Sequence, residues 1–361
     1  MKSAWFRLAL LVVLASVVVA GCAPAAATPA QVEVTRVVAG TPVVEKVVVT
    51  ATAAPVAEKP FKVAIVMPST ITDMAFSQSM YEGLKAVQTE MGGPSKMEIA
   101  YSENMFKMPD AAAALRDYAS QGYNLVIAHG SQYGTSLAQI APDFPEISFA
   151  WGASLDTFQS QGITNVFAYQ AEAQQGGYVL GVLAAMMSKT GTLGVAGPVE
   201  AGDAKLFVDG FKFGAEATKP GIKVPVTYTG SFSDVSLMAS AAETHIANGA
   251  DVLTGSSQSV VGAIGVAKDK KAFWFGTQWD QTKLAPETVV ASQVYDWTGM
   301  LKEIIASRAK GVLGGTAYKL QLNNGGLKIA YNSGYALPAD VKAAADKAIA
   351  DIKSGAVTVQ P

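Results

Sequence analysis

The side chains best suited to chemistry in this chain are aromatic rings, amides and hydroxyls that follow short apolar segments. Catalytic patterns are missing from its 361 residues: no Gly-x-Ser-x-Gly, no His-Glu-x-x-His and no Gly-x-x-x-x-Gly-Lys-Ser/Thr occurs. Because the only histidines are His129 and His245 and the only cysteine is Cys22, intrachain disulfides and multi-His or multi-Cys metal sites are excluded. The sequence favours noncovalent binding, and we expect no enzymatic activity, metal or cofactor.

Polar residues gather in four loops that follow predicted strands: 68–70, 130–132, 255–258 and 276–280. In open α/β sheets, ligands bind beyond the carboxyl ends of the strands. Aromatic residues lie on or beside such loops, namely Phe76, Phe232, Trp279, Tyr295 and Trp297. Aromatic faces stack on planar heterocycles, while amides and carboxylates hydrogen-bond to ring edges. Core packing is the alternative role for each of these aromatics.

The two histidines differ in their predicted positions. His129 ends a predicted strand at the expected binding edge, so it is either a hydrogen-bonding group of the pocket or a packing residue. His245 falls inside an amphipathic helix, where a surface or packing role is expected.

The amino terminus has the pattern of a bacterial lipoprotein. Lys2 and Arg7 precede an apolar stretch over residues 8–20, which is short for a span of a bilayer core of roughly 30 Å. Val19-Ala20-Gly21-Cys22 then resembles a lipobox, in which the cysteine sulfur receives the lipid. We expect residues 1–21 to be a signal peptide and Cys22 to anchor the chain to the membrane. The alternative is an ordinary signal peptide with an incidental cysteine.

Residues 22–59 are rich in Ala, Thr, Val and Pro, with prolines at positions 24, 29, 42 and 55. Proline interrupts regular structure. We expect an extended, poorly ordered tether. A second possibility is that the valine run at 47–49 is a strand that pairs with a partner.

From residue 61 onward, predicted strands alternate with predicted helices. Strands are expected over 61–67, 124–129, 147–151, 192–196, 224–228, 251–254 and 272–275, and helices over 172–189, 203–218, 234–248 and 259–269 among others. This alternation predicts parallel sheets flanked by helices. Because it restarts after about residue 167, we expect two lobes, one from 60–167 plus 299–320 and one from 168–298 plus 321–361.

The composition excludes one class of partner. Hydrophobic residues make up 50% of the chain, enough for a large core. The 27 Lys and Arg residues nearly balance 29 Asp and Glu residues, and no basic run occurs. A mildly acidic chain of this kind is not expected to bind nucleic acid.

Four segments along the folded part resemble motifs of the basic membrane protein (BMP) family, lipoproteins that are the substrate-binding components of nucleoside-type ABC transporters. They are 73–78 with 81–84 (Asp-x-x-Phe-Asn-Gln…Gly-Leu in the family), Glu172 with 177–181 (Glu…Tyr-Leu-x-Gly), 207–214 (Phe-x-x-Gly-Phe-x-x-Gly) and 228–234 (Tyr-x-Gly-Ser-Phe-x-Asp). The resemblance runs from Lys62 to Thr358. It implies a two-lobed periplasmic-binding-protein fold of type I, with a purine stacked in the interlobe cleft by the aromatics at positions 76 and 232.

This chain departs from the family motifs where the ligand's sugar would bind. The family's ribose-binding Asp is replaced by Gln278, its ribose-binding Lys by Tyr295, and the Asn after the first stacking Phe by Ser77. Loss of Asp and Lys together is chemically coherent, because losing one alone would leave the other's charge buried and unpaired. We therefore favour a nucleobase or another planar neutral heterocycle, narrowly, over a nucleoside.

The resulting hypothesis is a monomeric, lipid-anchored receptor on the extracytoplasmic face that closes on a purine-like ligand and presents it to an ABC permease and its ATPase. The alternative is a receptor of the same fold that acts on a membrane signalling partner. The candidate ligand-binding residues are Asp73, Phe76, Ser77, His129, Ser131, Phe232, Gln258, Gln278, Trp279, Asp280 and Tyr295.

Overall fold

The computed structural model describes residues 31–38, 41–48 and 59–360. The chain divides into two compact units, residues 1–58 and residues 59–361. The expected signal peptide over 1–21 and the expected lipidation site at Cys22 lie outside the described residues. In the part of the chain that the structure describes, no helix combines the length and apolar character needed to cross a bilayer.

The first unit contains an antiparallel strand pair, β1 (Gln31–Val38) and β2 (Thr41–Val48). They pair over their whole length, from Gln31 opposite Val48 to Val38 opposite Thr41. The expectation of an irregular tether is therefore wrong for these two segments, and the strands pair within the chain instead of with a partner. The physical reason is the repeated placement of valine among polar residues, which favours strands. Pro42 is tolerated because both strands of a two-stranded sheet are edge strands.

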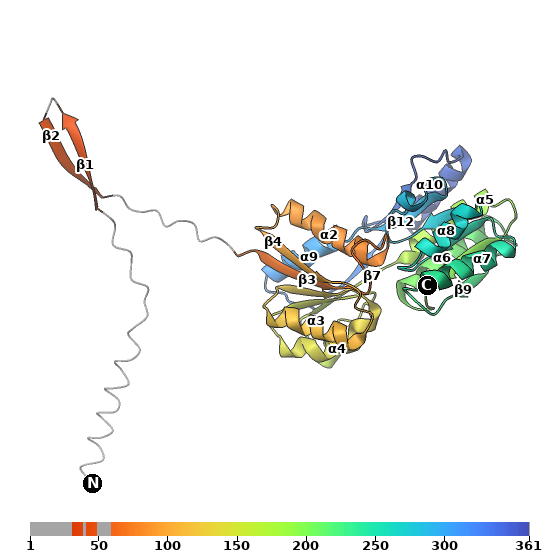
Figure 1. The fold of residues 1–361 in the computed structure, drawn as a ribbon, viewed down its shortest axis with the longest axis horizontal. Coiled ribbons are helices and arrows are strands. Elements are labelled where there is room, and N and C mark those ends of the chain that lie inside the picture. Colours follow the sequence, from red (N-terminus) through yellow and green to blue (C-terminus); the bar gives the residue numbers. More distant parts are fainter. Residues whose placement is uncertain (1–30, 39–40, 49–58, 361) are drawn as a thin grey trace, which may run out of the picture. The chain divides into compact units, whose positions relative to one another are not determined.

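The second unit contains two six-stranded sheets, each at the centre of one lobe (Figure 1). The first sheet is parallel throughout, in the order β13 (Ala317–Leu320), β7 (Val166–Ala171), β6 (Ser148–Gly152), β5 (Leu125–Ala128), β3 (Phe61–Val66) and β4 (Met97–Ser102). Residues 63–66 of β3 are fully buried, as the continuous apolar run predicted.

The second sheet has the order β14 (Leu327–Tyr331), β12 (Val289–Tyr295), β11 (Phe273–Gly276), β10 (Val252–Gly255), β8 (Leu193–Gly197) and β9 (Val226–Tyr228). Its pairs are parallel except β12 with β14, which is antiparallel. The expected α/β architecture with two mainly parallel sheets is confirmed.

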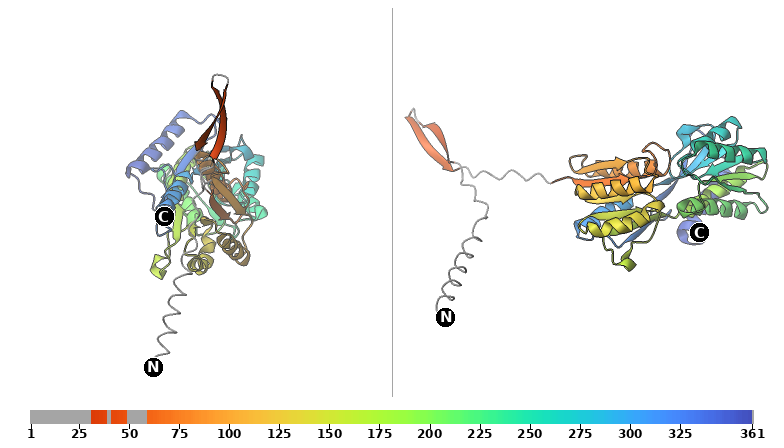
Figure 2. Two further views of the ribbon diagram at one scale, coloured as in Figure 1. Left: turned by 90° about the vertical axis from the view of Figure 1, so that its left-hand side faces the viewer. Right: turned by 60° about the horizontal axis from the view of Figure 1, so that its bottom comes forward.

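Helices flank both sheets, as the views of Figure 2 show. The first lobe has α2 (Phe76–Glu90), α3 (Met108–Ser120), α4 (Gly134–Ile140) and α9 (Thr298–Ala309), and the second has α5 (Ala173–Met187), α6 (Gly202–Thr218), α7 (Val235–Ala247), α8 (Val261–Asp269) and α10 (Ala339–Ser354).

The chain passes between the lobes three times. It crosses after β7, returns between β12 and α9, which packs on α2, and crosses again between β13 and β14. Strand β7 pairs with β13 as far as Ala171. The expected first crossing after residue 167 therefore falls inside a strand of the first sheet, because the pairing continues past that position.

Helices α5 and α6 approach each other unusually closely through glycines. A Cβ atom on any of four glycines would lie 2.1–2.4 Å from a backbone oxygen of the other helix; these are Gly177, Gly181, Gly210 and Gly214. Only glycine permits this approach without moving the helices. The contact fixes the position of α6, whose first turn faces the cavity described next.

Candidate ligand-binding site

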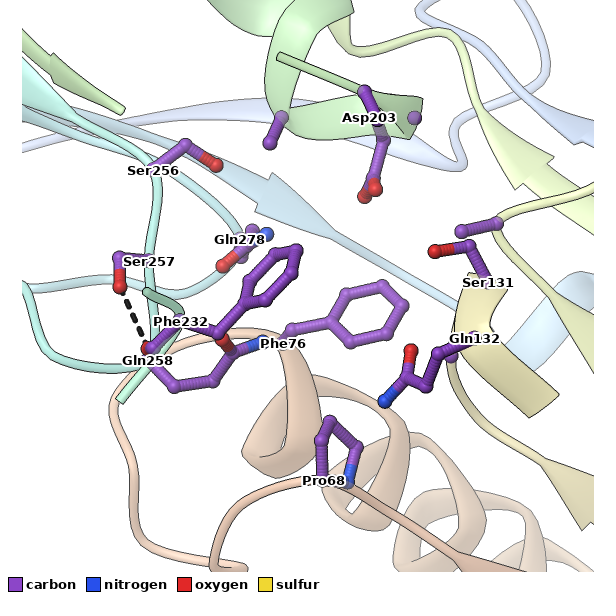
Figure 3. A pocket seen from close by; sticks show the side chains of 15 residues that line it. Pro68, Phe76, Ser131, Gln132, Asp203, Phe232, Ser256, Ser257, Gln258 and Gln278 are labelled. Carbon is purple, nitrogen blue, oxygen red and sulfur yellow. Dashed lines mark hydrogen bonds between the residues drawn. The ribbon is translucent and has the colours of Figure 1, made fainter. Parts of the chain in front are cut away.

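A cavity lies where the carboxyl-end loops of the two sheets meet (Figure 3). Its volume is about 30 Å³, which is room for a water molecule or two but not for a planar heterocycle. Five of the expected site residues line it: Phe76, Ser131, Phe232, Gln258 and Gln278. The lining also includes Pro68, Gln132, Asp203, Ser256 and Ser257.

The rings of Phe76 and Phe232 both project into the cavity from different lobes (Figure 3). Phe76 is the first residue of α2 and is 5% exposed, whereas Phe232 lies in the loop between β9 and α7 and is half-buried. The carbonyl of Phe232 accepts hydrogen bonds from the hydroxyls of Ser257, at 2.7 Å, and Ser259, at 3.3 Å. These bonds hold the Phe232 loop against the loop that follows β10.

His129 lies behind Phe76 and does not line the cavity. The two rings are stacked, with centroids 3.8 Å apart and 9° between their planes. Nε2 of His129 donates to the Phe76 carbonyl at 2.9 Å, so Nδ1 accepts from the Tyr169 hydroxyl at 2.7 Å. Burial lowers the pKa of His129 to about 3, which keeps the ring neutral. His129 therefore supports and orients Phe76, and both of its nitrogens are already bonded within the protein.

Tyr295 and Trp297 are buried among aromatic rings behind the cavity instead of lining it. Trp297 donates from Nε1 to Ser79 Oγ at 2.9 Å and makes edge contacts with the rings of Phe76, Tyr169 and Tyr295 at centroid distances of 6.2, 5.2 and 5.6 Å. These contacts tie the second crossing segment to α2. Trp279 is half-buried and is also outside the lining.

Asp73 and Ser77 act on the backbone around the start of α2. The Asp73 carboxylate accepts from the backbone N–H groups of Ala75, Ser77 and Gln78 at 2.8–3.1 Å. Burial nevertheless raises the pKa of Asp73 above its usual value. Ser77 Oγ accepts from the N–H of Ser69 at 3.2 Å. Both residues thus position Phe76 from outside the cavity, as groups that satisfy free N–H groups at a helix start do.

Gln278 occupies a strained position in the cavity wall. Its φ of 73° is in the left-handed region that residues other than glycine rarely adopt. Its side-chain Oε1 is buried and has no hydrogen-bond partner among the described residues, and the same holds for Gln258 Oε1. Asp280, in the same loop as Gln278, is exposed, and its carboxylate accepts from the N–H of Thr282 at 3.0 Å. Asp280 lies outside the lining.

Asp203 is a cavity residue that the sequence analysis missed. It lies in the first turn of α6, is 9% exposed, and its Oδ2 has no hydrogen-bond partner among the described residues. Burial raises the pKa of Asp203 to about 6, although its own backbone N–H, the Tyr295 hydroxyl and the N–H of Ala204 oppose this shift. The available signal was positional: residues 198–202 follow β8 just as the four predicted binding loops follow their strands.

The cavity combines aromatic faces with unpaired polar atoms and one carboxylate. No group of three or more His, Cys, Asp or Glu side chains that could bind a metal comes together in the described part of the chain. A lining of this kind suits noncovalent capture of a small planar polar molecule.

Comparison with known proteins agrees with this arrangement. Residues 61–357 match the family model described as Bmp, ABC transporter substrate-binding protein PnrA-like. The chain is 30% identical over 304 residues to a purine-binding protein of Brucella abortus, covering 83% of each. It is 27% identical over 323 residues to an ABC transporter nucleoside-binding protein of Lactococcus lactis, covering 82% of this chain and 88% of that protein.

A solved structure supports the fold. An ABC transporter solute-binding protein from Conexibacter woesei superposes with a TM-score of 0.68 at 20% identity, covering 83% of this chain and 98% of that one. The resemblance seen in the sequence motifs is confirmed, because the family model spans most of the chain. The family consists of substrate-binding proteins, not enzymes. The chain belongs to the Bmp family of ABC transporter substrate-binding proteins.

Proposed function

We propose that this protein captures a purine-type ligand, a nucleobase or a nucleoside, for an ABC importer and holds the ring between Phe76 and Phe232. The observation that carries the proposal is that these two rings, one from each lobe, line the same cavity. Amide and carboxylate oxygens without a hydrogen-bond partner line it as well. The names of the Brucella and Lactococcus relatives support a purine or nucleoside ligand.

The surroundings of the two rings suit a stacking role. One face of Phe76 is covered by His129, so the opposite face is the one that can receive a ligand ring. Phe232 is held through its carbonyl, which leaves its side chain free to contact a ligand. Each stacked aromatic pair contributes roughly 0.5–1.5 kcal/mol beyond the burial of apolar area.

The expected preference for a free base over its nucleoside rests on Gln278. A buried Asp at this position would be left unpaired by a ligand without a ribose, at a cost of about 1–3 kcal/mol. The neutral amide of Gln278 reduces that cost. The free base is therefore expected to bind at least as tightly as its nucleoside.

Side-by-side calorimetric titration of adenine, adenosine, guanine and guanosine tests this function. Binding of a free base with affinity equal to or above that of its nucleoside supports the proposal in full. A nucleoside bound tenfold more tightly, which is about 1.4 kcal/mol, would contradict the preference for the base while keeping the purine function. Absence of binding by all four would contradict the purine function.

The placement of the protein in the cell is part of the same proposal. We place it outside the cytoplasm, lipid-anchored through Cys22, monomeric, and in contact with a permease and an ATPase that complete the importer. The lipobox-like residues 19–22 support the anchor, and membership of a family of ABC transporter substrate-binding proteins supports the partners.

A further inference from the structure

Asp203 is the one charged side chain among the described residues that line the cavity. Its Oδ2 is buried without a hydrogen-bond partner, and no Lys or Arg belongs to the lining. Buried charges in proteins are normally paired or hydrogen-bonded, because loss of hydration is costly. Figure 3 shows the carboxylate directed toward the rings of Phe76 and Phe232. The Tyr295 hydroxyl faces this carboxylate and lowers its pKa, but it supplies no counter-charge and no hydrogen bond to Oδ2. The partner that Oδ2 still lacks would therefore come from the ligand.

The fold holds Asp203 in place without help from a counter-charge. The residue lies in the first turn of α6, where the helix dipole favours a negative charge. The close glycine contacts between α5 and α6 fix the helix itself. The carboxylate is thus preorganised for a partner that enters the cavity.

We propose that Asp203 is a specificity-determining residue that binds an exocyclic amino group of the ligand, so that the preferred ligand is an amino-substituted heterocycle. The inference rests on the proposed function and names the feature of the purine that the site selects.

An ionised carboxylate differs from the other polar groups of the cavity because it only accepts hydrogen bonds. The side-chain amides of Gln258 and Gln278 can present either an oxygen or an NH₂ group, so they adapt to donors and acceptors alike. A ring that turns an acceptor toward Asp203 would leave the charge unpaired. Sites of this kind discriminate strongly against analogues that lack the required donor.

The groups that face Asp203 do not titrate in the same range. They are the hydroxyls of Tyr169 on β7 and Tyr295 on β12, and burial raises the pKa of both well above 10. His129, which is bonded to Tyr169, stays neutral because burial lowers its pKa to about 3. A change in ligand preference between pH 5.5 and 7.5 would therefore report on the carboxyl of Asp203, whose pKa is about 6 without ligand.

The test uses three probes that differ by one amino group: purine, adenine and 2-aminopurine. Their affinities for the purified full-length protein are measured by calorimetry at pH 7.5 in the parent, in Asp203→Asn and in Asp209→Asn. Asp209 is the matched control, because it lies on the same helix but is solvent-accessible and paired with Lys205. We expect the parent and Asp209→Asn to bind at least one aminopurine tenfold or more tightly than purine. In Asp203→Asn this preference should fall below threefold.

Two further measurements allow for a variant that does not fold. Thermal unfolding without ligand should show Asp203→Asn at least as stable as the parent, because an unpaired buried charge has been removed. If that variant does not fold, the parent at pH 5.5 decides, where the preference for the aminopurine should drop at least threefold relative to pH 7.5. If the probes bind but the preference for the aminopurine over purine is the same in Asp203→Asn as in the parent, this inference alone is overturned. Where that variant does not fold, the same conclusion follows from a preference that is the same at pH 5.5 and pH 7.5. Failure of all three probes to bind the parent would overturn this inference, and failure of adenosine and guanosine as well would overturn the proposed function together with it.

Discussion

The two phenylalanines of the cavity are built into the protein in different ways. Phe76 is almost fully buried and contacts His129 and Trp297, so its removal would disturb the core as well as the cavity. Phe232 is half-buried on a loop that is held through backbone contacts. Replacement of Phe232 therefore separates a binding role from a structural one better than replacement of Phe76.

We predict that Phe232→Ala weakens purine binding by about 1–3 kcal/mol, the scale of base–aromatic stacking. Its effect on the unfolding free energy without ligand should be smaller than the ~3–5 kcal/mol typical of a buried Phe. Phe213→Ala is the control, since Phe213 is 47% exposed on α6 and lies outside the cavity lining. Calorimetry measures affinity and thermal unfolding measures stability. Equal affinity of Phe232→Ala and the parent would remove Phe232 from the site.

At this scale the sequence predicted the aromatic members of the cavity better than the charged one. Phe76 and Phe232 could be identified because they follow predicted strand ends and match a family motif. Asp203 also follows a predicted strand but matches no family motif, and an acidic residue in the first turn of a helix is ordinarily a solvated group that interacts favourably with the helix dipole. Its burial follows from the approach of α5 to α6, which brings distant segments together and is not visible in local spacing.

Among the elements, the α5–α6 pair gives a structural reason for the glycines of the family motif at 207–214. The glycines of 207–214, at Gly210 and Gly214, lie directly against the backbone of α5. The motif is thus a packing motif that places the first turn of α6, and Asp203 with it, at the cavity. It contributes to the site by positioning, without contact between these glycines and the cavity.

Gly214→Ala should destabilise the protein by about 1–3 kcal/mol, because the new Cβ would lie 2.1 Å from the carbonyl oxygen of Tyr178 and the helices must separate. Gly265→Ala is the matched control: Gly265 lies in α8 and a Cβ there meets nothing within 4 Å. That variant should be neutral or gain up to about 1 kcal/mol from helix propensity. Chemical denaturation compares the two. Similar effects of both substitutions would show that the close contact does not matter.

Periodicity predicted most of the central strands and helices, because buried parallel strands are continuous apolar runs and flanking helices are amphipathic. It was least informative for β1 and β2, where scattered prolines and small residues have the composition of a linker. The valines repeated between those residues favour strands, and the antiparallel pairing completes them. It also placed the first crossing too early, since the end of β7 is set by pairing with β13, far away in the sequence.

For the whole molecule, the proposed attachment to the membrane rests on residues outside the described part of the chain. Cys22→Ser should release the protein from the membrane fraction into the soluble fraction, because no other thiol is present to receive the lipid. Cell fractionation followed by immunoblotting measures this. A conservative change elsewhere in the same segment, such as Thr28→Ser, should leave the protein at the membrane. Unchanged membrane association of Cys22→Ser would defeat the lipid anchor.

The size of the cavity implies that the lobes must separate before a ligand can enter. About 30 Å³ does not admit a heterocyclic ring, and the side-chain amide of Gln281, from the second lobe, donates to the carbonyl of Met74 in the first at 3.3 Å. Ligand contacts from both lobes exist together only when the lobes are close, so binding should shift the population toward closed molecules.

Small-angle X-ray scattering of residues 59–361, which form one compact unit, tests this closure. The radius of gyration should decrease when a saturating purine is added. Phe232→Ala should need more ligand for the same decrease, because it lacks one of the contacts made only in the closed state. A radius of gyration that stays constant while calorimetry shows saturation would mean that side-chain movement alone admits the ligand, and that the two lobes remain together throughout binding.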